Sequence, residues 1–222
     1  MSMPSHRWDL TPGEAMALQK ALAERVVAEP TLGTVHTVAG IDASYKGEVG
    51  RAAIALFSFP ELELVKWVTA EGPIDFPYVP GLLSFREGPV VLEALKKLGT
   101  RPDLLIFDAH GLAHPRRFGL ACHIGVLRQI PSIGCAKRRL VGHYEEPDRT
   151  RGSTAPLIDE GEVIGAVVRT RTDVQPLFVS VGHLVDLEMA VHYVLACGAG
   201  YKLPEPTRWA DKIAGGSLPP GA

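Results

Sequence analysis

The sequence predicts an α/β protein with a mixed sheet, in which three antiparallel strands are followed by parallel β-α units with helices on both faces. Two observations lead to this class. Three β-branched or alternating runs follow one another early in the chain and are joined by short turns. Apolar runs then alternate with helical patterns, which is typical of parallel strands that are buried on both faces. With 222 residues, 46% apolar content and no internal repeat, we expect a single domain over residues 1–222.

The first half of this pattern contains one helix and three strands. Thr11-Pro12 is a helix start, and regularly spaced apolar side chains predict a helix over residues 13–28. The strands are expected over residues 34–42, 51–59 and 61–69. Their short connections favour an antiparallel meander.

The parallel units follow. A helix over residues 82–99, kinked or restarted at Pro89, leads to a strand over 103–108. A second helix over 119–129 leads to a strand over 131–136. Helices that alternate with apolar strands in this way imply parallel crossovers and a sheet that is covered on both faces.

The last third is less regular. Residues 144–162 are polar and rich in turn formers, so we expect an excursion without regular structure. A hairpin over 163–180 and a helix over 183–197 follow. We expect an ordered core over residues 6–213 and a disordered tail over 214–222, where Gly, Ser and Pro dominate.

The segment FPYVPGLLSFREGP, residues 76–89, is unusual for a soluble protein. Pro77 and Pro80 enclose Tyr78, and proline fixes φ and removes a backbone donor. The segment is either a tight connection that packs Tyr78 into the core or a stiff loop that exposes it. The two prolines favour the exposed tyrosine.

Three acidic residues lie on three separate predicted elements. Asp42 and Asp108 each end a strand, and Glu87 lies on the helix between them. A single Asp after a strand is most often a turn former or a helix cap. If the two strands are neighbours, however, both carboxylates meet at one sheet edge, where α/β folds bind ligands. Three acids on three elements favour Mg²⁺, which prefers oxygen ligands, whereas the Cys and His quartets typical of zinc are missing.

Basic residues occupy the same segments. The net charge of −2 excludes a global basic field, so only local clusters could bind nucleic acid. His114, Arg116 and Arg117 follow Asp108, Lys137 follows the next strand, and Arg208 precedes Asp211. Any one arginine pair could be a solvated surface, but cations that flank a metal site match a phosphodiester substrate.

The sequence gives little sign of targeting. The start MSMPSHRWDL has no apolar core of signal-peptide length, and no run reaches the ~18 apolar residues of a membrane span. We therefore expect a cytoplasmic protein that does not associate with membranes. Cys122, Cys135 and Cys197 are widely spaced in apolar segments, so we expect three buried thiols.

Six segments together resemble a known family: GIDASY, FPYVPGLLSFREGP, FDAHGLAHPRRFGLACHIG, PSIGCAKRRL, VSVGHLVDLEMA and EPTRWAD. In this order they look like endonuclease V, the deoxyinosine 3′ endonuclease family. The resemblance runs from about His6 to Ile213. It implies a ribonuclease H-like fold, which agrees with the order of strands and helices predicted above.

The resemblance also implies an activity. Members of the family cleave DNA that contains hypoxanthine, a deaminated purine, at the second phosphodiester bond 3′ to the lesion. The reaction depends on Mg²⁺, for which Mn²⁺ is expected to substitute, and leaves a 3′-OH and a 5′-phosphate. Some members prefer RNA that contains inosine, so an inosine-specific endoribonuclease is the alternative. The implied protein is a monomer.

The resemblance assigns the catalytic residues of the family to positions of this sequence, one motif at a time. Asp42 of GIDASY, Asp108 of FDAHG and Glu87 of FREGP match the metal ligands. Asp211 of EPTRWAD matches a position near the metals that the family fills with Asp or His. Lys137 and His114 correspond to residues beside the scissile phosphate, and we expect all six residues to be catalytic.

The substrate-binding residues come from the loop and the basic clusters. Tyr78 matches the tyrosine of a PYIP-type wedge, with Val79 in place of Ile, and the patch behind it is expected to wall the pocket of an everted base. Ala109 departs from the family motif, because many relatives have Gly at this position. Its added methyl group is expected to crowd the backbone beside the lesion pocket and so to affect base preference. The complete expected set is Pro77, Tyr78, Val79, Pro80, Gly81, Leu82, Leu83, Gly111, Arg116, Arg117 and Arg208.

One reading from another functional class remains open. The chain could be a nucleic-acid-binding module without activity, although its complete set of acids argues against this. The sequence does not decide between DNA and RNA, between one and two metal ions, or how broadly xanthine, uracil and mismatches are accepted.

Overall fold

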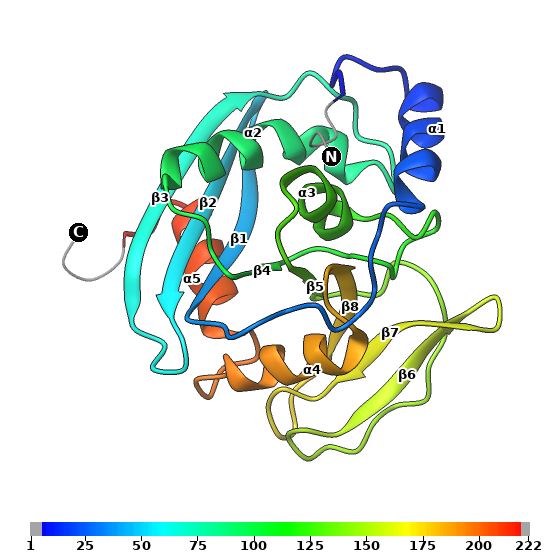
Figure 1. Ribbon diagram of the computed structural model, residues 1–222, viewed down its shortest axis with the longest axis vertical. Helices are drawn as coiled ribbons and strands as arrows, with labels where there is room; N and C mark the ends of the chain where they lie inside the picture. The colour runs from blue at the N-terminus through cyan, green and yellow to red at the C-terminus, as the bar shows by residue number, and fades with distance from the viewer. Residues whose placement is uncertain (1–5, 219–222) are drawn as a thin grey trace.

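A computed structural model describes residues 6–218, which fold around an eight-stranded mixed sheet in the order β3-β2-β1-β4-β5-β8-β7-β6 (Figure 1). The strands are β1 (Thr37–Lys46), β2 (Val49–Ser58), β3 (Leu64–Pro73), β4 (Leu104–Phe107), β5 (Ser132–Ala136), β6 (Thr154–Asp159), β7 (Glu162–Val168) and β8 (Leu177–His183). The helices are α1 (Pro12–Ala23), α2 (Leu83–Leu98), α3 (Leu120–Arg128), α4 (Leu187–Ala196) and α5 (Glu205–Ala214).

The sheet combines both kinds of pairing. β1, β2 and β3 form an antiparallel meander, and β4 and β5 join it in parallel to β1. β8, β7 and β6 then extend the other side with antiparallel pairs. The predicted class is confirmed: three antiparallel strands, then parallel β-α units in a mixed sheet.

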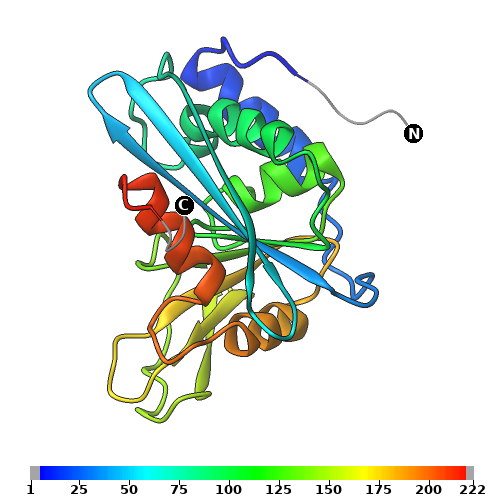
Figure 2. The same cartoon turned by 90° about the vertical axis from the view of Figure 1, so that its left-hand side faces the viewer.

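Helices cover both faces of the sheet, as predicted. Alternate residues of β1, β2 and β4 face α2 and α3 on one side, where Ile41, Ile54 and Phe107 are buried with Val91. On the other side α5 packs on β2 through Ile213, and α4 packs on β8 and β7. Figure 2 shows α2 and α5 on opposite sides of β1 and β2.

Helix α5 approaches β1 closely because the strand has a glycine at the crossing. A Cβ atom on Gly40 would lie 2.0 Å from the carbonyl carbon of Pro206. The missing side chain therefore lets the two backbones touch. This contact brings the C-terminal helix over the middle of the sheet.

The structure differs from the sequence-based boundaries at β1. The strand was expected to end at Asp42 but continues to Lys46, because its last residues pair with the start of β2 around Gly47. Gly47 has a φ of 62°, which suits a tight hairpin. Asp42 therefore lies inside a strand, whereas Asp108 directly follows β4 as predicted.

The prediction of an irregular excursion over 144–162 is wrong in its second half. β6 runs through it and pairs with β7 as an edge strand. Pro156 is one of the turn formers of this segment, yet proline is tolerated on an edge strand, where its nitrogen needs no partner in the sheet. The hairpin of β7 and β8 and the helix α4 are present as expected, with α4 starting at Leu187.

The remaining expectations concern termini, thiols and membranes. Ala214 ends α5 and is buried, and residues 219–222 of the expected tail lie outside the described residues.

All three cysteines are free and buried, as predicted. Among residues 6–218 no helix has both the length and the apolar character needed to cross a membrane.

Candidate functional site

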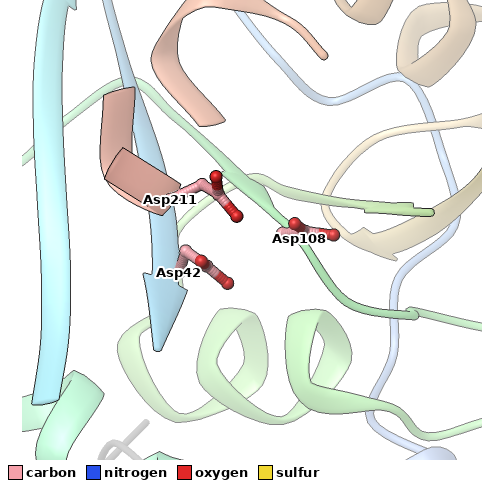
Figure 3. A group of neighbouring side chains, drawn as sticks. All are labelled: Asp42, Asp108 and Asp211. Atoms are coloured by element: carbon pink, nitrogen blue, oxygen red, sulfur yellow. The ribbon is translucent and has the colours of Figure 1, made fainter. Parts of the chain in front are cut away.

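Three aspartates from distant parts of the chain meet at one edge of the central strands (Figure 3). Asp42 lies on β1, Asp108 directly follows β4 and Asp211 lies on α5. The parallel pairing of Ile41 with Phe107 sets the first two side by side. One carboxylate oxygen from each of the three residues lies within 4.8 Å of the others.

One lysine neutralises part of this charge. Nζ of Lys137, which follows β5, lies 2.6 Å from Oδ2 of Asp108 and 2.6 Å from Oδ1 of Asp211. Burial lowers the pKa of Lys137, but the hydrogen bonds to the two aspartates outweigh it, so the net pKa is raised. Lys202 is also close enough for its charge to lower the pKa of Asp108. Lys202 was not among the site residues predicted from the sequence.

The nearby lysines nevertheless neutralise the negative charge of the aspartates only in part. Burial, followed by the charge of Asp108, raises the pKa of Asp42 to about 8. Burial also raises the pKa of Asp108, against the opposing effect of Lys137. Buried carboxylates that repel one another fit a divalent cation, and oxygen ligands suit Mg²⁺ or Mn²⁺. The residues present therefore fit the metal that the sequence predicts.

Glu87 lies beside this group rather than within it. Its buried carboxylate on α2 accepts a short hydrogen bond from the hydroxyl of Tyr45. Burial raises the pKa of Glu87 to about 7, although the bond from Tyr45 acts in the opposite direction. Its charge still reaches Asp42 and raises the pKa of that residue. Tyr45 is a site residue that the sequence analysis missed, although it ends the GIDASY segment.

The loop before α2 exposes its tyrosine. Tyr78 is 76% exposed, whereas Phe76 and Leu82 on either side are buried and anchor the loop. The amide of Leu82 donates to the carbonyl of Val79, and Gly81 has a φ of 79°, so the chain turns sharply into the helix. The alternative of a core tyrosine is excluded by this exposure.

A cavity of about 170 Å³ lies between this loop and the segment after β4. Ala109 lines it, so the methyl group that replaces the usual glycine is part of its wall. Ser84, His110 and Leu140 are lining residues that the sequence analysis did not select. The expected members that line it are Pro77, Tyr78, Val79, Pro80, Gly81, Leu82, Leu83 and His114.

Three side chains hold the loop at a single carbonyl oxygen. The oxygen of Gly81 accepts from Nε2 of His114 at 2.8 Å, Nη2 of Arg116 at 2.7 Å and Nε2 of Gln19 at 3.1 Å. The backbone amide of Arg116 donates to Nδ1 of His114, so both ring nitrogens have partners. Burial lowers the pKa of His114 to about 4, so the ring is neutral. His114 and Arg116 thus position the loop.

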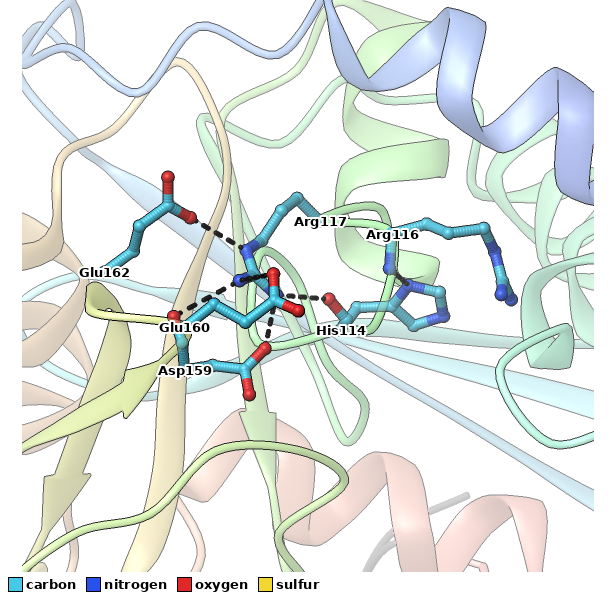
Figure 4. Close-up of polar contacts among 6 residues, drawn as sticks. All are labelled: His114, Arg116, Arg117, Asp159, Glu160 and Glu162. Carbon is cyan, nitrogen blue, oxygen red and sulfur yellow. Dashed lines mark hydrogen bonds and ion pairs between the residues drawn. The ribbon is translucent and has the colours of Figure 1, made fainter.

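Arg117 is engaged with three acids from the β6–β7 hairpin (Figure 4). Its Nη1 lies 2.8 Å from Oδ2 of Asp159, and its Nε lies 3.3 Å from Oε2 of Glu162. Nη2 lies 4.0 Å from Oε2 of Glu160. The structure therefore gives Arg117 acidic partners within the protein.

Arg208 and Gly111 also have partners within the fold. Arg208 bonds to Glu205 and lies over the ring of Tyr201, 4.2 Å from its centroid. The amide of Gly111 donates to Oγ of Ser180, and a Cβ atom there would lie 1.9 Å from the carbonyl oxygen of Val181. Neither residue lines the cavity, and their roles in substrate binding stay predictions.

Comparisons with known proteins agree with this geometry. The model of the Endonuclease V family matches residues 20–212. Endonuclease V of Roseiflexus sp. strain RS-1 is 52% identical over 207 residues, which are 93% of each chain. The crystal structure of Endonuclease V from Streptomyces avermitilis has a TM-score of 0.89 and 44% identity, and covers 93% of this chain and 92% of its own.

A third relative has been solved with nucleic acid. Endonuclease V of Ciona intestinalis, in complex with a 24mer DNA containing an inosine followed by a ribo-adenosine, has a TM-score of 0.80 and 28% identity. The match covers 91% of this chain and 95% of that one. These structural neighbours confirm the ribonuclease H-like fold. The extent of these matches shows that the chain is a nuclease of the Endonuclease V family.

Proposed function

We propose that this nuclease recognises hypoxanthine in DNA and hydrolyses the second phosphodiester bond 3′ to it in a Mg²⁺-dependent reaction. The observation that carries the proposal is the exposed Tyr78 on a proline-braced loop that lines a cavity near the carboxylate cluster. The Ciona intestinalis relative, solved with inosine-containing DNA, supports the same substrate class.

Recognition follows from the loop and the cavity. An enzyme that selects one altered base must take that base out of the stack. The cavity of about 170 Å³ receives the everted base, while Tyr78 stacks in the gap that the base leaves. A loop fixed by two prolines and by the bonds to the Gly81 oxygen loses little conformational entropy on binding.

Asp42, Asp108 and Asp211 are the residues that would hold the divalent cation. The resemblance places Glu87 ahead of Asp211 as a ligand, but the geometry favours Asp211, whose oxygen lies in the group of three. Glu87, bonded to Tyr45, is assigned to a supporting position beside the metal. A bound cation supplies fixed positive charge to the reacting phosphate and makes a water more acidic.

We assign Lys137 an assisting role at the phosphate. An ammonium group has three N–H donors, and two of them point to Asp108 and Asp211. The third remains for a non-bridging phosphate oxygen, where negative charge grows in the transition state. The water oxygen gives up a proton to the solvent and bonds to phosphorus, the bond from phosphorus to the 3′ oxygen breaks, and the 3′ oxygen takes a proton from the solvent, so that the products are a 3′-OH and a 5′-phosphate.

The test is a nicking assay on a duplex with one hypoxanthine and end labels on both strands. We expect Mg²⁺ or Mn²⁺ to be required, with one nick at the second phosphodiester 3′ to the lesion. A matched duplex with adenine at that position is the control.

The sugar preference is tested with the same sequence as DNA, as DNA with one ribonucleotide after the inosine, and as RNA. Cleavage of the RNA alone would replace the DNA repair function with the inosine-specific endoribonuclease. The absence of nicking in all three with either metal would contradict the proposal.

A further inference from the structure

Two residues that line the cavity each have a buried side-chain atom without a hydrogen-bond partner within residues 6–218. These atoms are Oγ of Ser84, at the start of α2, and Nδ1 of His110, in the segment after β4. Both residues line the cavity, and Ser84 is only 2% exposed. Buried polar groups nearly always have partners, because an unsatisfied one carries a desolvation cost. Two such residues in the wall of one small cavity are therefore candidates for binding the polar groups of a ligand.

The other lining residues offer little to a polar ligand. Most of the loop side chains are proline or aliphatic, and His114 already has partners for both ring nitrogens. Arg86, also in the wall, donates to the carbonyl of Phe76. Ser84 and His110 are thus the lining residues with a buried side-chain atom that lacks a partner among residues 6–218.

We propose that Ser84 and His110 are specificity-determining residues that read the hydrogen-bonding edge of the everted purine. The proposal rests on the function proposed above, because it assumes that hypoxanthine enters this cavity. It adds which side chains distinguish hypoxanthine from adenine, the base from which deamination produces it.

The chemistry of the two edges gives the direction of the discrimination. Nδ1 of His110 has no partner within residues 6–218. With the other nitrogen protonated, Nδ1 is an acceptor. Hypoxanthine offers an N1–H donor and an O6 acceptor, so it can donate to Nδ1 of His110 and accept from the hydroxyl of Ser84. Adenine has a lone pair at N1, which Nδ1 would repel.

The experiment compares single-turnover cleavage of two duplexes, one with hypoxanthine and one with unsubstituted purine, which lacks both the N1–H and O6. We expect the wild-type protein to prefer hypoxanthine. His110→Phe and Ser84→Ala should each slow cleavage of the hypoxanthine duplex roughly 10- to 100-fold, because one hydrogen bond to a buried group is lost. Cleavage of the purine duplex should change little.

His110→Asn is the conservative variant, because its side chain keeps a polar atom near the position of Nδ1. It should recover part of the preference that His110→Phe loses. His192→Asn and Ser217→Ala, at exposed positions, are the matched controls and should behave as wild type. Melting temperatures identify any variant that fails to fold.

The outcomes separate this inference from the proposed function. If the wild-type protein cleaves the hypoxanthine duplex but the folded variants keep its full preference over purine, the roles of Ser84 and His110 are refuted and the function stands. Equal losses on both duplexes would likewise refute a role in reading the base. If wild type cleaves no inosine-containing substrate, the proposed function itself fails.

Discussion

At the scale of single residues, the site depends on negative charge that the fold has withdrawn from water. Asp42, Asp108 and Glu87 all have raised pKa values, and burial is the largest cause for each. Lys137 offsets part of this charge through its bonds to Asp108 and Asp211. The remainder represents free energy that a bound divalent cation can recover.

We therefore expect Asp42→Asn and Asp108→Asn each to remove most cleavage, because a Mg²⁺ site built from few carboxylates weakens when one anionic ligand is lost. Binding to hypoxanthine DNA should persist, since repulsion of the phosphate also decreases. Nicking rates across a Mg²⁺ series and affinities measured in Ca²⁺ test this, with the exposed Asp148→Asn as control.

Asp211→Asn separates two assignments. The resemblance predicts a smaller effect than at Asp42, whereas the grouping of the three carboxylates predicts a comparable one. Near-normal cleavage by Asp211→Asn at low Mg²⁺ would return Glu87 to the position of third ligand.

The raised pKa of Asp42 also predicts a pH dependence of the metal-free protein. Its folded-state pKa of about 8 exceeds the ordinary value of 3.8, so the folded protein holds a proton that the unfolded chain releases. This group stabilises the fold at low pH, and the contribution is lost as pH rises toward 8. Buried His110 and His114, with pKa values of about 4, act in the opposite direction, but only below their ordinary value of 6.5.

The informative window thus lies between about pH 7 and pH 8. In this window the melting temperature of the metal-free protein should fall with pH, and Asp42→Asn should flatten the curve. Mg²⁺ should raise the melting temperature more at pH 8 than at pH 6.5, because a protonated carboxyl binds the ion poorly. Equal slopes for wild type and Asp42→Asn would assign the effect to other groups.

At the scale of elements, the loop before α2 acts as one preformed unit. Tyr78→Ala should lose stacking on the order of 1–3 kcal/mol, with the largest effect on a paired duplex, where the base is hardest to extrude. Tyr78→Phe should keep most activity. Because Tyr78 is exposed, its loss should leave the melting temperature unchanged. Single-turnover rates on paired and single-stranded inosine substrates test whether Tyr78 stacks in the gap left by the everted base. An equal loss of rate on both substrates would argue against this role.

The β6–β7 hairpin is tied to the cavity segment through Arg117. If Arg117 binds a phosphate, as predicted from the sequence, Arg117→Ala should reduce by ~0.9 the slope of log affinity against log salt concentration. Its bonds to Asp159 and Glu162 predict instead an unchanged slope and a stability loss of about 1 kcal/mol. A double-mutant cycle of Arg117→Ala with Asp159→Ala should show coupling. Affinities over a salt series and denaturant melts distinguish the two roles.

The elements that the sequence predicted best are those with a strong local signal. The apolar run of β4 and the alternating runs of the meander were predicted because burial on one or both faces fixes their pattern. β6 was missed, since an edge strand needs no such pattern and Pro156 resembles a turn signal. No element was assigned around Asp211, where α5 begins directly after Pro204.

At the scale of the whole molecule, the site joins both halves of the chain. The meeting of Asp42 and Asp108 was predictable, because it follows from the order of two parallel strands. The bonds of His114 to the Gly81 oxygen and of Arg117 to the hairpin were not, since they depend on tertiary contacts without a local pattern. The position of Asp211 depends on how α5 docks across the sheet.

That docking leads to a final prediction. Gly40 lies on β1 where α5 crosses, and a Cβ atom there would meet the carbonyl carbon of Pro206 at 2.0 Å. Backbone cannot move aside as a flexible side chain can, so Gly40→Ala should displace α5. We expect a loss of stability of about 1–3 kcal/mol, typical of overpacking, and weaker Mg²⁺ binding because Asp211 moves with the helix.

Gly72→Ala is the matched control, because Gly72 lies on β3 of the same sheet with nothing within 4 Å of an added Cβ atom. It should keep both stability and Mg²⁺ affinity. Hydrogen exchange of residues 205–214, with calorimetric Mg²⁺ titration, separates displacement of α5 from general damage to the sheet. Faster exchange confined to α5 in Gly40→Ala would show that the helix has moved. A Gly40→Ala protein with wild-type exchange and Mg²⁺ affinity would mean that Asp211 reaches the cluster without this close contact.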